Sequence, residues 1–373
     1  MENKRYIILL FVLICICFLL VGYFNFEKII TFFNDREWEF AESFATINVD
    51  NISQVEAGNS LLVLTNNRLE LYKDSAISEY SENLISTGVI CNASEDYLVV
   101  AVRDTNTISL FKESELIWQK KFNWTILNAS VNKNGYVTVI YSQAGYKSSI
   151  KIFKPSGEEL FTTYLASTYA LDVEMSNDNK TLYIAEIDTE GIKIKSNIKV
   201  IEVAVLESAQ NITPNVETLL DGTDTLITDI EFSNLNKLFI LRESGIDVID
   251  SEKKIKNISQ FEIKNTLFSS INSLNYPIVI EKKSTGIFTN ETNLKILKED
   301  EILEINIQKT PQGIDAMNDK IALNLGDEVL FLNTNGKVVK RYELERQLSE
   351  IKLYNKGNCA ALVFRDRIEL IKL

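Results

Sequence analysis

The sequence contains no histidine, and this absence removes several classes of catalytic and metal site. Catalytic triads of the Ser-His-Asp type, Cys-His nucleophile pairs and every metal site with an imidazole ligand are excluded. Proline and glycine are also scarce, with 4 and 14 residues among 373, which excludes collagen-like and low-complexity chains. Hydrophobic residues make up 45% and charged residues 24% of the chain, a composition typical of a folded protein.

Cysteine is scarce as well, with 4 residues in the whole chain. Cys15 and Cys17 lie in the first apolar run, whereas Cys91 and Cys359 lie in two separate strand-like runs. No CxxC spacing occurs, and a disulfide scaffold would need more cysteines at closer spacing. We therefore expect Cys91 and Cys359 to be buried free thiols.

Basic residues are outnumbered, with 39 Lys and Arg against 52 Asp and Glu, a formal net charge of -13. An acidic surface repels phosphate backbones, so we expect no nucleic-acid partner. The same repulsion argues against anionic lipid surfaces and wall polymers as broad electrostatic partners. The excess of carboxylates is interpreted as a solvated surface that maintains solubility.

Only one long apolar run is present, Tyr6–Phe24, and it contains no charged residue. As a helix it would span about 28 Å, close to the roughly 30 Å hydrocarbon core of a bilayer. Lys4 and Arg5 precede the run, whereas Glu27 and Asp35 follow it. By the positive-inside rule, the sequence predicts a transmembrane signal anchor at 6–24, a cytoplasmic tail at 1–5 and an extracytoplasmic remainder.

Three alternatives to a signal anchor fit the sequence less well. A cleaved signal peptide would have a shorter apolar region and a small-x-small exit, and no A-x-A pattern follows the run. A lipoprotein signal would need a small residue before its cysteine, but Ile14 precedes Cys15 and Ile16 precedes Cys17. A buried core helix is disfavoured by an unbroken apolar run at the extreme N-terminus.

Residues 25–38 continue with a helical pattern. Phe26, Ile29, Ile30 and Phe33 recur at helical spacing among charged residues, which predicts a short amphipathic stalk.

From residue 39 onward the chain consists of short apolar runs separated by turns rich in Asn, Asp, Gly and Ser, so the predicted class is all-β. The most apolar run of each unit recurs eight times, mostly about 40 residues apart, and the repeat of a propeller blade is about 40–45 residues. The eight runs begin at Leu61, Tyr97, Tyr136, Thr181, Lys237, Pro277, Lys320 and Cys359. Residues 39–373 are therefore predicted to form an extracytoplasmic β-propeller with eight four-stranded blades. Seven blades are the alternative if the unit at Pro277 is irregular.

The last unit ends at Leu373 after its third strand. Residues 44–49 alternate between apolar and polar positions, so we expect this N-terminal strand to complete the last blade. Such a closure joins the two ends of the ring and removes exposed strand edges.

A resemblance supports this interpretation. Ser176–Asp188, SNDNKTLYIAEID, resembles the turn and strand of bacterial WD40-like, YVTN and Tol-associated propeller repeats, and the turns at Gly157 and Gly336 are similar to those of quinoprotein-type repeats. The whole layout resembles an uncharacterised family of membrane-anchored propeller proteins from low-GC Gram-positive bacteria. This resemblance covers nearly the whole chain. It implies a fold and a location but no activity.

Candidate ligand positions are few. Asp172, Asp229 and Asp315 occupy similar places near the start of the predicted innermost strands, where carboxylates around a channel mouth can bind a cation. The structural alternative is that each carboxylate accepts hydrogen bonds from backbone amides of a neighbouring loop. Glu174 and Glu231 follow two of these residues at i+2, so each pair shares one face of its strand.

Recognisable catalytic signatures are absent from the sequence. P-loop, GxGxxG and GxSxG motifs, the sialidase Asp box and the adjacent paired cysteines of many quinoprotein dehydrogenases do not occur. We expect no enzyme activity and no cofactor. The predicted function is a membrane-anchored scaffold or sensor that binds a protein or envelope component. The alternative is an enzyme or small-ligand binder with its site at the channel mouth.

Overall fold

The computed structural model describes residues 39–84, 86, 88–203, 216–223, 225–271, 275–284, 290–298 and 301–373. The predicted anchor at 6–24 and the stalk at 25–38 lie outside the described residues. In the part of the chain that is described, no helix has the length and apolar character needed to cross a bilayer.

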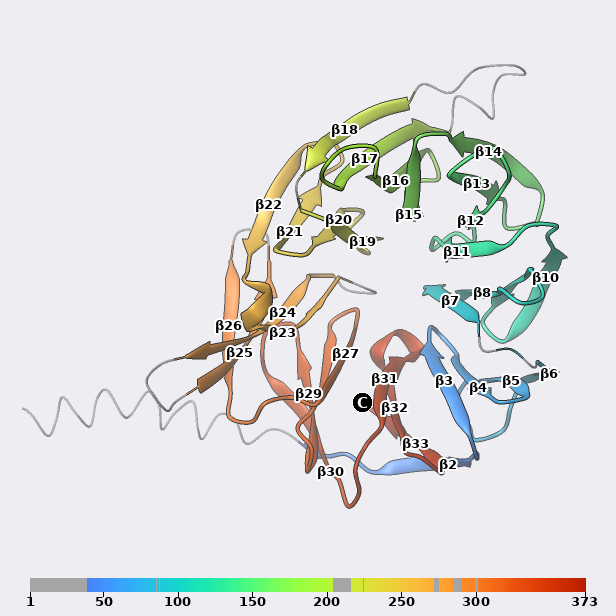
Figure 1. The fold of residues 1–373 in the computed structure, drawn as a ribbon. Helices are drawn as coiled ribbons and strands as arrows, with labels where there is room; N and C mark the ends of the chain where they lie inside the picture. Colours follow the sequence, from blue (N-terminus) through green and yellow to red (C-terminus); the bar gives the residue numbers. More distant parts are fainter. Residues whose placement is uncertain are drawn as a thin grey trace, which may run out of the picture.

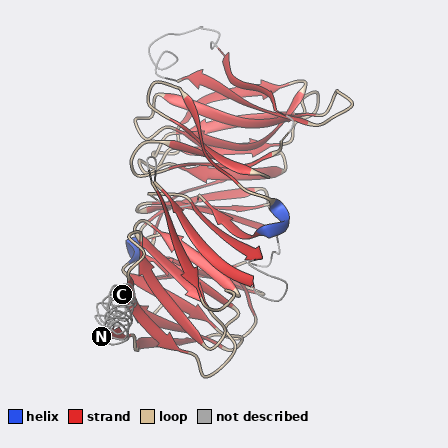
Figure 2. Cartoon of the chain, turned by 90° about the vertical axis from the view of Figure 1, so that its left-hand side faces the viewer, coloured by secondary structure: helices blue, strands red, loops and turns tan. Residues whose placement is uncertain are grey.

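Eight antiparallel sheets stand around a common axis like the blades of a propeller (Figure 1). Viewed from the side, the ring is a flattened body built almost entirely of strands (Figure 2). The prediction of an all-β propeller with eight blades is therefore confirmed, and the alternative of seven blades is wrong.

Blades are numbered along the chain, and each is given from its innermost to its outermost strand. Blades 1 and 2 consist of β3 (Ile52–Ala57), β4 (Leu61–Thr65), β5 (Arg68–Tyr72) and β6 (Tyr80–Asn83), then β7 (Val89–Ser94), β8 (Tyr97–Val102), β9 (Thr107–Lys112) and β10 (Glu115–Lys121). Blades 3 and 4 consist of β11 (Ile126–Val131), β12 (Val137–Tyr141), β13 (Ser148–Phe153) and β14 (Glu159–Leu165), then β15 (Thr168–Met175), β16 (Thr181–Asp188), β17 (Lys195–Glu202) and β18 (Val216–Thr223).

The second half of the ring repeats this plan. Blades 5 and 6 consist of β19 (Ile227–Phe232), β20 (Leu238–Arg242), β21 (Gly245–Ile249) and β22 (Ile255–Gln260), then β23 (Thr266–Ser270), β24 (Ile278–Ser284), β25 (Asn290–Leu297) and β26 (Ile302–Ile307). Blade 7 consists of β27 (Gly313–Met317), β28 (Lys320–Asn324), β29 (Glu328–Asn333) and β30 (Val338–Glu343). Blade 8 consists of β31 (Glu350–Tyr354), β32 (Cys359–Val363), β33 (Arg367–Lys372) and the N-terminal β2 (Ser43–Asn48). Two short 3-10 helices, η1 (Ile263–Asn265) and η2 (Asn355–Gly357), lie beside inner strands.

Burial explains the hydrophobic pattern of each blade. The second strands β4 and β12 are buried along their whole length, because both faces of the strand pack against neighbouring blades. Outer strands alternate instead, as β26 does, because one face is exposed to water. The hairpin turns at Gly157 and Gly336 have φ of +82° and +80°, which an L side chain rarely adopts.

The ring closes through the N-terminus. β2 pairs antiparallel with β33, and Ile47 lies opposite Ile368. This is the segment in which the alternating pattern at 44–49 predicts a closing strand. The preceding β1 (Glu39–Phe40) pairs in parallel with β30 and adds a fifth strand to blade 7.

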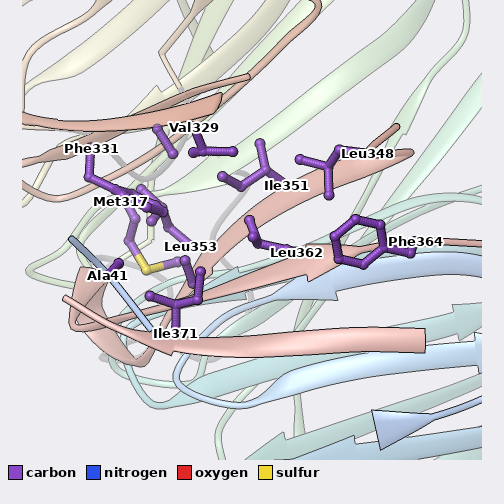
Figure 3. Packing of buried hydrophobic residues seen from close by; sticks show 12 residues of the cluster. Ala41, Met317, Val329, Phe331, Leu348, Ile351, Leu353, Leu362, Phe364 and Ile371 are labelled. Carbon is purple, nitrogen blue, oxygen red and sulfur yellow. The ribbon is translucent and has the colours of Figure 1, made fainter. Parts of the chain in front are cut away.

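Hydrophobic side chains fill the spaces between blades rather than one central core. Between blades 7 and 8, Phe331 packs with Leu353, Leu362 and Ile371, and all four side chains are buried (Figure 3). Complete burial of such a side chain contributes roughly 1.5–3 kcal/mol. The channel in the middle is therefore free to carry polar residues.

Two faces of the ring are distinguished below. The start face is the face on which every inner strand begins, and it also carries the loops that connect second to third strands. The hairpin face is the opposite one, on which every inner strand turns into its second strand. Side chains of all eight inner strands line the cavities along the axis.

Candidate functional site

The three aspartates predicted as channel positions all lie on inner strands. Asp172 on β15 and Asp229 on β19 line one axial cavity of about 170 Å3. Asp315 on β27 lines an adjoining cavity of about 180 Å3. Glu231 lines both cavities, so it connects the two sites. The structure thus brings Asp172 and Asp229 together and leaves Asp315 across the channel.

Hydrogen bonds connect Asp172 and Asp315 to the neighbouring blade. Asp172 Oδ2 accepts a hydrogen bond from the backbone amide of Ile230 at 3.3 Å, and Oδ1 accepts from the amide of Val173 at 2.9 Å. The Asn128 side chain donates to Oδ1 at 3.2 Å. Asp315 in turn accepts from the backbone amide of Leu353 in blade 8. These bonds are the structural role that the sequence offered as the alternative to cation binding.

Four carboxyl groups share one side of the channel. Glu174 is only 4% exposed and lies near Asp172 and Asp229. Burial, and then the negative charges of Glu231 and Asp172, raise the pKa of Glu174 well above its usual value. Burial and the charges of Asp229 and Asp172 likewise raise the pKa of Glu231. This wall therefore retains protons at pH values where exposed carboxyl groups are ionised.

On the opposite wall of the channel, the positive charge of a lysine is balanced by two carboxylates. Lys352 on β31 forms ion pairs with Glu350 at 3.1 Å and with Glu56 at 3.3 Å. Burial raises the pKa of Asp315 to about 7, and Lys352 partly opposes this shift. The channel is thus asymmetric, with acidic groups alone on β15 and β19 and mixed charges on β31, β3 and β27.

Cys91 lines both axial cavities and is a free thiol. Burial raises its pKa, so the reactive thiolate form is disfavoured. Cys359 is a buried free thiol between blades, as expected.

Two tryptophans pack on aromatic rings. Trp118 packs on Phe153 and Trp124 packs on Tyr141, although Trp124 remains 38% exposed.

Contacts across the channel narrow its end at the hairpin face. The Asn318 side chain donates to the Lys356 carbonyl at 3.1 Å, and Asn234 donates to Asn318. Lys356 Nζ forms ion pairs with Glu95 at 3.2 Å and Asp96 at 3.3 Å, two blades further along the ring. The cavity under these residues measures only about 40 Å3. Of the two wider cavities, the one lined by Leu171 and Thr228 lies toward the start face.

Sequence reasoning missed Lys352 and Glu56. Lys352 occupies the same place on its inner strand as Asp315 does in the preceding blade. Alignment of the repeats by strand position, without regard to the charge of the residue, identifies Lys352 as the equivalent of Asp315. Among the described residues, no group of three Cys, Asp or Glu side chains can hold a metal ion. The channel can accept hydrogen-bond donors or a positively charged group, but its wall offers no activated nucleophile.

Comparison of the sequence with known protein families gives one match. A sequence model described as a family of unknown function matches residues 35–373. No curated protein is similar in sequence.

Solved structures similar to this chain are propellers with different roles. The C-terminal WD40 domain of Sif2 has a TM-score of 0.55 at 15% identity, over 90% of this chain and 99% of that one. The dihydro-heme d1 dehydrogenase NirN, solved in complex with DHE, has a TM-score of 0.55 at 11% identity, over 87% of this chain and 75% of that one. The Dos1 propeller has a TM-score of 0.53 at 11% identity, over 89% of this chain and 95% of that one. At such identities the similarity establishes the fold alone.

Proposed function

Because the chain belongs to DUF5711, a family of unknown function, we propose a function from its own residues: it is a membrane-anchored scaffold or sensor. Its propeller would bind a protein or an envelope component outside the membrane. The physical basis is a broad and rigid pair of loop faces on a closed ring.

The observation that carries this proposal is a group of exposed aromatic rings on the start face. Tyr146 and Tyr164 stack at 4.6 Å between ring centroids, and both are more than 40% exposed. Trp124 stacks on the buried Tyr141 at 5.2 Å in the same blade. Aromatic side chains with one face packed and one face exposed are enriched where proteins bind partners.

Membrane attachment is proposed from the uncharged run Tyr6–Phe24 and the basic residues before it. Chain direction supports an orientation of the propeller. β1 runs parallel to β30, and β30 runs from the hairpin face to the start face. β1 therefore also runs from the hairpin face toward the start face. In a membrane-anchored protein, the start face would point away from the bilayer.

Two measurements on the full chain test this proposal. Extraction of membranes with alkaline carbonate should leave the protein in the pellet, and external protease should digest the propeller in intact protoplasts. In-cell crosslinking, with a version lacking 39–373 as control, should capture a partner only when the propeller is present. Recovery of the full chain in the soluble fraction, or identical captures from both versions, would refute the proposal.

A second candidate is a small-ligand binder or enzyme with its site at the channel mouth. It is favoured by the two axial cavities of about 170 and 180 Å3 with carboxylates in their walls. Replacement of Asp172, Asp229 and Asp315 by asparagine should then abolish a thermal shift caused by a small organic cation. If no such compound stabilises the unsubstituted protein, this candidate is refuted.

A further inference from the structure

Five inner strands have a β-bulge at the same place, just inside the start face. The extra residues are Ser53, Leu127, Leu171, Thr228 and Leu267. A bulge leaves one residue outside the ladder and changes the direction of the side chains that follow. Leu171 and Thr228 line the mouth of the 170 Å3 cavity, and Leu127 and Leu267 are each 38% exposed. Blades 3 to 6 thus present consecutive bulge residues, three of them leucine, around one side of the mouth.

More apolar side chains are exposed on the same face of the same blades. Outside the bulges, these are Trp124, Tyr146, Tyr164, Tyr169, Ile192, Ile194 and Ile263. On blades 7, 8, 1 and 2, the described loops of the start face expose no large apolar side chain. Clustered apolar surface of this kind marks interaction sites, whereas single exposed residues are ordinary. One half of the start face is therefore chemically different from the other.

The cavity beside this apolar surface is acidic. We call it the acidic well; Asp172, Asp229 and Glu231 line it, and none of its described lining residues is basic. Arg103 lies at the outer rim, where its guanidinium donates to the Leu127 carbonyl at 3.1 Å. Lys352 belongs to the adjoining cavity and is paired with Glu56 and Glu350. Among the described residues that line the well, three are acidic and none is basic.

We propose that the start face of blades 3 to 6 binds a polypeptide segment in which one lysine or arginine is flanked by apolar residues. The cationic side chain enters the acidic well, and its apolar neighbours pack on the bulge leucines and the exposed aromatic rings. The carboxylates of the well favour a basic side chain through charge complementarity. The apolar side chains of blades 3 to 6 favour apolar residues on either side of that basic residue. This inference rests on the proposed interaction function and specifies the chemistry of the partner.

The carboxyl groups of the channel should make the affinity for such a peptide depend on pH. The titratable groups that line the well are Asp172 from β15, Asp229 and Glu231 from β19, and Cys91 from β7. Glu174 of β15 is buried and interacts with Asp172, Asp229 and Glu231, and Asp315, Lys352 and Glu56 lie across the channel. Burial and the neighbouring carboxylates raise the pKa of Glu174 and Glu231, so these groups retain protons more readily than exposed carboxyl groups do. A bound ammonium or guanidinium group favours the ionised carboxylates, so binding releases protons. Affinity should therefore increase as the pH rises and these carboxyl groups lose their protons.

The test uses the full chain in detergent micelles and a display library of random peptides. Enriched peptides should contain one Lys or Arg between apolar or aromatic residues. Replacement of that basic residue by glutamine should weaken binding at least about ten-fold, and the binding heat should depend on the ionisation enthalpy of the buffer. Enrichment of peptides without a basic residue, or no enrichment at all, would overturn the proposal.

Protein variants test the site itself. Asp229→Asn combined with Glu231→Gln, and separately Leu127→Ser combined with Leu267→Ser, should each weaken the selected peptide about ten-fold. The matched control is Asp178→Asn combined with Glu158→Gln, which removes two carboxylates from loops of the hairpin face and should leave affinity unchanged. Thermal unfolding shows that each variant is folded. Unchanged affinity in a folded well variant contradicts the proposal.

A photo-crosslinking amino acid in cells separates this inference from the proposed function. Placed at Thr228 it reports the start face, and placed at Leu235, which is 50% exposed, it reports the hairpin face. A partner crosslinked from Thr228 supports both proposals. A partner crosslinked only from Leu235 supports the scaffold but overturns the start-face site, and no partner at either position counts against both.

Discussion

Asp172 in blade 4 accepts a hydrogen bond from the backbone amide of Ile230 in blade 5, so one carboxylate joins two inner strands. The same group accepts from Asn128 of blade 3. Three consecutive blades are therefore connected through one side chain. Asp315 makes the equivalent connection from blade 7 to Leu353 of blade 8.

Asp172→Ala should destabilise the propeller by about 1–3 kcal/mol, because the backbone amide of the buried Ile230 loses its acceptor. Asp172→Asn retains a carbonyl oxygen as an acceptor, so it should lower the free energy of unfolding clearly less than Asp172→Ala does. Urea unfolding of both variants, followed by tryptophan fluorescence, measures the difference. Equal stabilities for the two variants would show that the hydrogen bond contributes nothing.

Stability should decrease as pH rises from about 5 to 8. Burial raises the pKa of Asp315 from 3.8 to about 7, and Glu174 and Glu231 are shifted in the same direction. A group whose pKa is raised in the folded state adds to the free energy of unfolding, and this stabilisation is fully present below the pKa of the unfolded state. The stabilisation is lost as the pH rises through the pKa of the folded state. We expect a loss of a few kcal/mol over this range, measured by urea unfolding at each pH.

Asp315→Asn provides the control for this pH dependence. The amide does not ionise, so the decrease in stability between pH 5 and 8 should become smaller. An identical slope in the variant would mean that Asp315 does not change its ionisation between pH 5 and 8.

Ile47→Ala should destabilise the protein by about 2–4 kcal/mol, because this residue of the closing strand is only 3% exposed and packs between blades 8 and 1. Phe44 lies on the same strand but is 45% exposed, so Phe44→Ala should change stability by less than about 1 kcal/mol. Thermal unfolding of the two variants compares them directly. Similar losses at both positions would argue against tight packing of β2.

Gly245→Ala should destabilise blade 5 by about 1–3 kcal/mol. A Cβ at this position would lie 2.6 Å from the Ser259 carbonyl oxygen, and backbone atoms cannot easily move away. Gly313 begins β27, where the nearest atom to an added Cβ is 3.8 Å away, so Gly313→Ala should be neutral or slightly stabilising. Urea midpoints decide between these outcomes, and equal midpoints would contradict the steric argument.

The blade count could be predicted because each second strand is buried on both faces and therefore reads as a continuous apolar run. LLVLT at β4 and CAALV at β32 are such runs, from the first and the last blade. β1 could not be predicted, since Glu39 and Phe40 have no periodicity and pair only because the edge of β30 is available. The bulges were equally invisible, because Leu127, Leu171 and Thr228 are ordinary strand residues and no glycine marks them.

The candidate site was predictable only in part. Equivalent places in neighbouring repeats indicated that Asp172 and Asp229 would meet, and they line one cavity. Asp315 has the same place in its repeat but lies two blades further around the ring, so its surroundings contain Lys352 instead. The position of a residue within its repeat determines how deep it lies in the channel. The side chains that face it across the channel depend on how the blades are arranged in the closed ring.

The closing strand has a consequence for biosynthesis. β2 is among the first segments of the propeller to be made and its partner β33 is the last, about 320 residues later. A ribosome adds roughly 5–20 residues per second, so the first strand waits at least several seconds for its partner. Throughout that time the nascent ring is open and both of its edges are unpaired. Any factor that holds β2 during synthesis would therefore control the yield of folded protein, and any fragment truncated before Arg367 would remain permanently unclosed.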